Sequence, residues 1–260
     1  MALEIVRKLT SEEEELLRKR EELTSVRSAL AERELELADL RALLKSFEGR
    51  YLRQVGVLYA ELDEWEAKIA EIEASLKPSA TASQRAQETR ERAEETHEAT
   101  HGEASKARDF QPSADLRSLF REAAKRIHPD FAKDEADREL RTRLMAQVNE
   151  AYSQGDADAL QRILDEFSNL PESVQGEGVG AELVRIIRQI HQAKKNIAAI
   201  EQELNCLRAS EIAQLKQDAE TAEQEGRDLL AELAADVRER IDGAKKKHKA
   251  LSAELKTHGR

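Results

Sequence analysis

The sequence is poor in the residues that build large cores, tight turns and cross-links. Only nine of its 260 residues are aromatic, and it has 10 glycines, 4 prolines and a single cysteine, Cys206. Because each buried aromatic side chain removes roughly 150–250 Å² of surface from water, so few aromatics cannot fill a large core. A single cysteine cannot form an internal disulfide. These shortages exclude a large globular domain and a disulfide framework.

Long apolar runs and an excess of positive charge are also missing. No stretch approaches the roughly 18 apolar residues of a membrane span, and the first ten residues lack the apolar core of a signal peptide. Lys and Arg number 42 against 53 Asp and Glu, which gives a net charge of −11. Nucleic acids and anionic membranes attract positive surfaces, so we expect neither as a partner of the whole chain. A cytoplasmic location is expected.

The chain is instead rich in helix-forming residues. It is 40% hydrophobic and 37% charged, with few residues that break helices. This composition is typical of long helices and coiled coils, and it predicts an all-α fold in which coiled-coil helices flank a small helical module. The predicted organisation is an N-terminal coiled coil (1–77), a polar linker or solvated helix (78–110), a module (111–168), a loop (169–180) and a C-terminal coiled coil (181–260).

The N-terminal coiled coil is predicted from an apolar residue at every seventh position. The repeat consists of Leu16, Leu23, Leu30, Leu37, Leu44, Tyr51, Leu58, Trp65 and Ile72. The second apolar position of each heptad slips by one residue between Phe47 and Val55. A seven-residue repeat of this length keeps one seam facing another helix, until Pro78 ends it.

A second repeat runs from Leu183 to Leu255, with a phase shift near Glu211 that is typical of a stutter. Cys206 lies beside this seam, where a small apolar filler is the simplest interpretation. Two arrangements satisfy both repeats. One is an antiparallel hairpin within the chain, with residues 77–182 at its tip, and the other is a parallel homodimer.

The module begins with an amphipathic helix. Ser113 is the expected N-cap, and Pro129 must end the helix because proline disfavours helical geometry in the residue before it. His128-Pro129-Asp130 is therefore expected at the corner of an exposed turn. The apolar stripe of the helix is Leu116, Leu119, Phe120, Ala123, Ala124 and Ile127. A second helix, ended by Gly155, and a third, capped by Asp156, complete the predicted module.

This segment resembles a known family. "LRSLFREAAKRIHPD" followed by "RLMAQVNEAY" is similar to the second and third helices of the J-domain of DnaJ-type co-chaperones. In that family the His-Pro-Asp turn and a basic helix engage an ATP-bound DnaK-type chaperone and trigger ATP hydrolysis. The resemblance implies that the partner-binding residues are His128, Pro129, Asp130, Arg117, Arg121, Lys125 and Arg126.

The remainder of the chain departs from the DnaJ pattern. The short first helix of the J-domain is absent, and no glycine- and phenylalanine-rich or zinc-binding region follows the module. The resemblance therefore implies a specialised co-chaperone that is not itself an enzyme, whose coils recruit a client protein or an assembly. The alternative is a scaffold protein whose J-like tip is inactive. No cofactor is expected, because the sequence has no glycine-rich phosphate loop and ATP would be bound by the chaperone.

One further motif matches a zinc-protease helix. His97-Glu98-Ala99-Thr100-His101 fits the pattern H-E-x-x-H, in which two histidines one turn apart bind the metal. The flanking sequence is almost all polar, so it offers no dry cavity, and no third ligand has suitable spacing. We therefore expect no metal site here.

Overall fold

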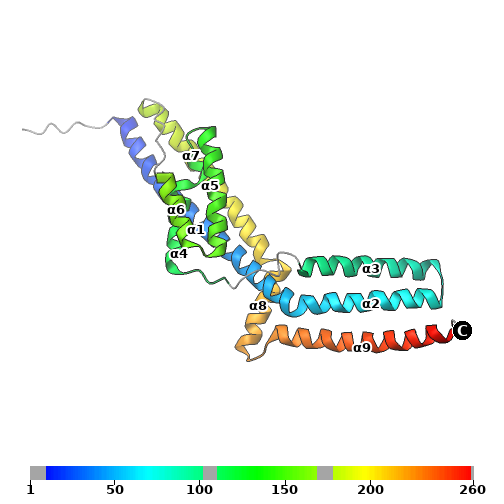
Figure 1. Cartoon of the computed structure of the whole chain (residues 1–260). Helices are drawn as coiled ribbons and strands as arrows, with labels where there is room; N and C mark the ends of the chain where they lie inside the picture. Colours follow the sequence, from blue (N-terminus) through cyan, green and yellow to red (C-terminus); the bar gives the residue numbers. More distant parts are fainter. Residues whose placement is uncertain (1–9, 102–109, 169–177, 259–260) are drawn as a thin grey trace, which may run out of the picture. The chain divides into compact units, whose positions relative to one another are not determined.

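The computed structural model describes residues 10–101, 110–168 and 178–258 (Figure 1), and within these ranges no strand is present. The predicted all-α fold is confirmed. None of the described helices is both long enough and apolar enough to cross a membrane. The elements are α1 (Ser11–Tyr51), the π-helical turn η1 (Leu52–Gly56), α2 (Val57–Leu76), α3 (Ala80–His101), α4 (Ala114–Ile127), the 3-10 turn η3 (Pro129–Phe131), α5 (Glu135–Gln154), α6 (Ala157–Ser168), α7 (Val179–Arg208), α8 (Glu211–Gln224) and α9 (Leu229–His258).

The chain divides into two compact units, each containing parts of both predicted coiled coils. The first unit takes the described residues of Met1–Ala42 and Phe110–Arg208, and the second those of Leu43–Asp109 and Ala209–Arg260. The first unit therefore holds the start of α1, the module and α7. The second holds the end of α1 together with α2, α3, α8 and α9.

In the first unit, α1 and α7 pair side by side and run in the same direction. Arg20 near the start of α1 pairs with Glu182 near the start of α7 at 2.6 Å, and Glu36 pairs with Arg208 at the end of α7 at 2.5 Å. The buried seam between the two helices consists of Leu16, Leu23, Val26, Leu30, Leu37, Ile186, Ile190, Ala193, Ile200 and Leu204, with Phe131 of the module beside them.

In the second unit, α2 lies between α3 and α9 (Figure 1). α3 runs antiparallel to α2, because Arg90 pairs with Glu71 at 3.0 Å and the later Thr96 donates to the earlier Asp63 at 2.9 Å. α9 follows the direction of α2, and its Val237 and Ile241 share a buried cluster with Leu62.

The antiparallel hairpin, one of the two arrangements that the repeats allow, is not formed between the described segments. Segments of the two predicted coiled coils pair within one chain, but in parallel. Within the second unit α3 turns back along α2, and within the first unit the module packs on α1. Within the first unit, the start of α7 lies beside the start of α1, since Glu182 pairs with Arg20.

Two irregularities in the repeats have structural counterparts. The one-residue slip between Phe47 and Val55 coincides with η1, where a π-helical turn accommodates one extra residue. The phase shift near Glu211 is a complete break and not a stutter. α7 ends at Arg208 and α8 starts afresh, with the Ser210 hydroxyl accepting from the Ala213 N–H.

The segment 78–110, expected to be a linker or a solvated helix, contains α3. This helix packs along α2 largely through charged and polar side chains, including ion pairs from Arg92 to Asp63 and Glu66. Ala93 is its one buried apolar residue among those described. The loop expected at 169–180 lies outside the described residues up to 177, and α7 already begins at Val179.

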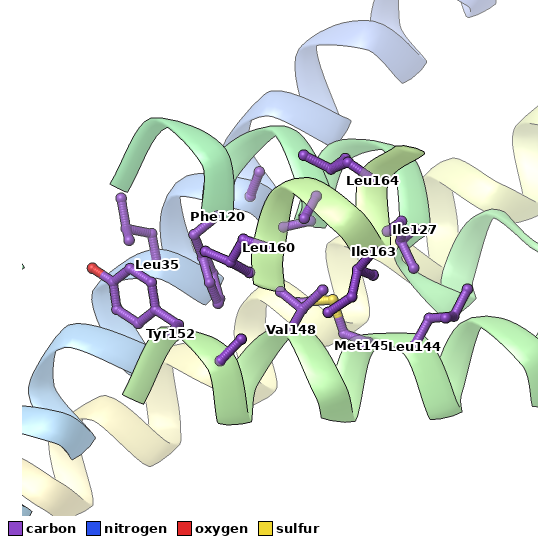
Figure 2. Close-up of a cluster of buried hydrophobic side chains, with 14 of the residues drawn as sticks. Leu35, Phe120, Ile127, Leu144, Met145, Val148, Tyr152, Leu160, Ile163 and Leu164 are labelled. Carbon is purple, nitrogen blue, oxygen red and sulfur yellow. The ribbon is translucent and has the colours of Figure 1, made fainter. Parts of the chain in front are cut away.

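The module consists of α4, α5 and α6 around one buried cluster, which Figure 2 shows. Phe120 and Tyr152 are fully buried at its centre, with their ring centroids 4.6 Å apart. Leu35 and Ala31 of α1 belong to the same cluster, and Leu35 is 5% exposed. The module therefore completes its core with a helix of the coiled coil.

Candidate functional site

The His-Pro-Asp turn connects α4 to α5. Ser113 caps the start of α4 by accepting from the Leu116 N–H, as predicted. α4 ends at Ile127, because His128 takes the extended geometry (φ −52°, ψ 134°) that a following proline favours. Pro129 opens η3, and the Asp130 N–H donates to His128 Nδ1 at 3.2 Å. The turn is thus fixed locally by His128 and Pro129.

α1 covers the histidine of the turn. The His128 side chain is 5% exposed, and its Nε2 lies 3.1 Å from Glu34 Oε1. Because Nδ1 accepts the Asp130 N–H, the ring proton resides on Nε2, which donates to the Glu34 carboxylate. The histidine therefore connects the turn to α1.

α7 covers the aspartate of the turn. Asn196 Nδ2 lies 2.7 Å from both carboxylate oxygens of Asp130, whose side chain is only 7% exposed. Burial raises the pKa of Asp130 above its usual value, and the neighbouring His128 and the Asn196 hydrogen bonds partly oppose this effect. The expected exposed turn with a free carboxylate is therefore wrong, because two coiled-coil helices pack over it.

Phe131, directly after the motif, extends the contact. Its side chain is 4% exposed and lies among the apolar residues of the α1–α7 seam. The Arg27 guanidinium of α1 lies 4.4 Å from the centre of the ring, and Gln189 of α7 donates to the Phe131 carbonyl at 3.4 Å. Gln189 and Asn196 lie two turns apart on one face of α7, with the fully buried Ala193 between them.

The first two basic residues of α4 face α1. Arg117 lies 3.3 Å from Asp39, and Arg121 lies 3.7 Å from Glu32. Asp39 also accepts a hydrogen bond from the Tyr152 hydroxyl at 2.5 Å. Burial of the tyrosine, together with this hydrogen bond, raises the Tyr152 pKa. Both arginines are thus partly engaged by carboxylates of the coiled coil.

The last two basic residues of α4 remain accessible. Arg126 is exposed, lies 3.1 Å from Glu122 and donates to the Ser168 hydroxyl at 2.6 Å. Lys125 is exposed and has no ion pair with any residue that the structure describes. Of the seven predicted partner-binding residues, the structure brings His128, Pro129 and Asp130 together in one closed turn and leaves this basic pair beside it.

The candidate zinc motif lies on α3, which carries both His97 and His101. The side chain of His101 falls outside the described part of the structure. Among the side chains that are described, no group of three His, Cys, Asp or Glu residues could hold a metal ion.

Sequence reasoning missed the residues that close the turn. Glu34 and Asn196 lie 94 and 66 positions from their partners, and each sits among many similar polar residues of the coils. No local signal distinguishes them. Comparison of the chain with family models, with curated proteins and with solved structures gives no match.

Proposed function

We propose that this protein is a J-domain co-chaperone that stimulates ATP hydrolysis by a DnaK-type chaperone through His128-Pro129-Asp130. The proposal is carried by the fully formed turn, in which His128 Nδ1 accepts the Asp130 N–H at the corner between α4 and α5. The accessible Lys125 and Arg126 at the end of α4 add positive charge beside it. Such charges suit a steered, salt-sensitive encounter with an acidic partner surface.

We further propose that the coiled coil holds this activity in check. A chaperone cannot reach Asp130 while Asn196 and α7 cover it, so α7 must leave the turn first. Burial of each apolar side chain in the seam between α1 and α7 stabilises their packing by about 1.5–3 kcal/mol. Changing the ratio of closed to open turn from 99:1 to 1:99 requires about 5.5 kcal/mol. This free energy is comparable to the loss of two or three such contacts. A client bound to the coils could supply this energy.

The substitution Ala193→Gln tests the proposal, because Ala193 is fully buried on the face of α7 that lies against the turn. A longer side chain there wedges α7 away, and overpacking of this kind costs about 1–3 kcal/mol. Single-turnover ATP hydrolysis by a DnaK-type chaperone should be stimulated about tenfold more by this variant than by the wild type, since about 1.4 kcal/mol changes a population tenfold.

Two control variants accompany Ala193→Gln. Ala234→Gln makes the same change at a buried site of the second unit, 3% exposed, and should leave stimulation at the wild-type level. Adding Asp130→Asn to the Ala193→Gln variant should abolish the gain. Equal stimulation by all of these folded variants, or none by any of them, would contradict the co-chaperone proposal.

A scaffold protein is the second candidate, favoured by the burial of the motif itself. His128 binds Glu34 of α1 and Asp130 binds Asn196 of α7, so the turn braces two helices of the coil. A pure brace predicts that Asp130→Asn changes the melting temperature and that neither the wild type nor Ala193→Gln stimulates the chaperone. The same set of measurements therefore separates the two candidates.

A further inference from the structure

A groove of about 960 Å³ lies beside the turn within the first unit, between the module and the helices α1 and α7. Its apolar lining includes Leu23 of α1, Phe131 of the turn and Ile186 of α7. Seven cationic but only three anionic side chains line it, although the whole chain carries a net charge of −11. The groove is thus a concentrated positive site on an acidic protein.

Arg27 is a cationic residue of the groove with a buried nitrogen that lacks a hydrogen-bond partner. Its Nε is the one buried side-chain nitrogen or oxygen in the described ranges that lacks a hydrogen-bond partner. Its guanidinium stacks on Phe131 and forms no ion pair with a described residue. Burial, with repulsion from nearby Arg141, lowers the Arg27 pKa. An anion bound at this guanidinium would therefore offset the free-energy cost of burying a charged group without a hydrogen-bond partner.

Two lysines extend the uncompensated charge along the groove. Lys125 at the end of α4 and Lys133 before α5 are both exposed, and neither side chain pairs with an acidic residue in the described part of the chain. Arg141, in contrast, is held by Asp137 at 2.8 Å and by the Arg126 carbonyl at 2.8 Å. Three cations from three segments thus remain available to a ligand.

We propose that this groove binds an acidic segment of a partner protein. Carboxylates of the segment would pair with Arg27, Lys125 and Lys133, while its apolar side chains would contact Leu23 and Phe131. The charges are distributed over separate elements around an apolar surface, which suits an extended peptide with alternating acidic and apolar residues better than a single small anion. Asp130, on which stimulation of the chaperone depends, does not line the groove, and the peptide assay below contains no chaperone, so the two proposals are tested separately.

Fluorescence anisotropy of the full chain with a labelled twelve-residue peptide of alternating Glu and Leu tests the proposal. The peptide should bind, and its Kd should rise with salt. Arg27→Gln should raise the Kd roughly tenfold, because hydrogen bonds to charged groups are strong. Lys133→Gln, at an exposed site where folding is not at risk, should raise it several-fold.

The matched control is Arg18→Gln, which removes the same charge from α1 at a side chain that is 74% exposed and outside the groove. It should leave the Kd unchanged. Equal effects of Arg18→Gln and Lys133→Gln would overturn the proposal, because they would indicate non-specific attraction. Equally tight binding of a Lys-Leu peptide would overturn it, as would displacement of the acidic peptide by millimolar inorganic phosphate at matched ionic strength.

Discussion

At the scale of single residues, the turn combines local and distant contacts in the same side chains. His128 accepts the Asp130 N–H through one ring nitrogen and donates to Glu34 through the other. Asp130 is buried, which is costly for a carboxylate without hydrogen bonds, and Asn196 supplies two donor contacts. The conformation of the turn and its closure by the coil are therefore linked.

The substitution Phe131→Ala measures how much the contact between the turn and the α1–α7 seam stabilises the protein. The ring is 4% exposed within the α1–α7 seam, so its removal should lower the free energy of unfolding by about 3–5 kcal/mol. Phe167→Ala removes a half-buried ring of the module and should lower the free energy of unfolding by clearly less. Chemical denaturation of both variants makes the comparison. A loss below about 0.5 kcal/mol for Phe131→Ala, as is usual for exposed sites, would contradict the closed turn.

The sequence was informative where a residue's role depends on its near neighbours. The cap at Ser113, the helix end before Pro129 and the left-handed Gly155 (φ 73°) are all set by contacts within about four residues. The exposure of Asp130 was wrongly predicted, because it depends on Asn196, which is distant in sequence. Local rules describe the shape of the turn but not what covers it.

At the scale of elements, the module depends on the coiled coil for part of its core. Ala31 and Leu35 of α1 belong to the buried cluster that contains Phe120, Leu160 and Tyr152 (Figure 2). α1 covers apolar surface that α4, α5 and α6 would otherwise expose. In the co-chaperone that we propose, α1 therefore takes the place of the first helix of the J-domain.

Leu35→Ala tests this dependence. Truncation of this buried leucine should lower the free energy of unfolding by about 2–5 kcal/mol. Because Leu35 contacts the core of the module, amides of α4, α5 and α6 should exchange with solvent faster in native-state hydrogen exchange. The control Leu17→Ala, at a side chain that is 46% exposed, should leave these rates unchanged. Unaltered exchange in the module of the Leu35→Ala variant would mean that its core is self-sufficient.

The heptad repeats predicted helices well but not their ends. The slip before Val55 is a π-helical turn, and the shift near Glu211 is a helix break capped by Ser210. A change of phase in a repeat is compatible with a π-turn, a stutter or a break. The choice among these depends on which helix packs alongside, and a single-sequence pattern does not contain that information.

At the scale of the whole chain, both repeats contribute to both units, and their paired segments run in parallel. Apolar periodicity specifies that a seam is buried but not the direction of the partner helix. α3 runs antiparallel to α2 within the second unit, although its polar sequence resembles a linker. Within the first unit, α7 packs onto a turn that was expected to be exposed.

The most direct test of this closed unit is the pKa of the Asp130 carboxyl, measured by carbon-detected NMR titration. In the wild type it should lie above 3.8, the usual value for an aspartate, because burial disfavours the charge. The closed turn then binds a proton more tightly than an open one, so lowering the pH favours closure. In Ala193→Gln, where α7 is displaced, the pKa should fall toward 3.8. A wild-type pKa already at or below 3.8 and unchanged by Ala193→Gln would contradict the proposal that the coiled coil closes over the His-Pro-Asp turn.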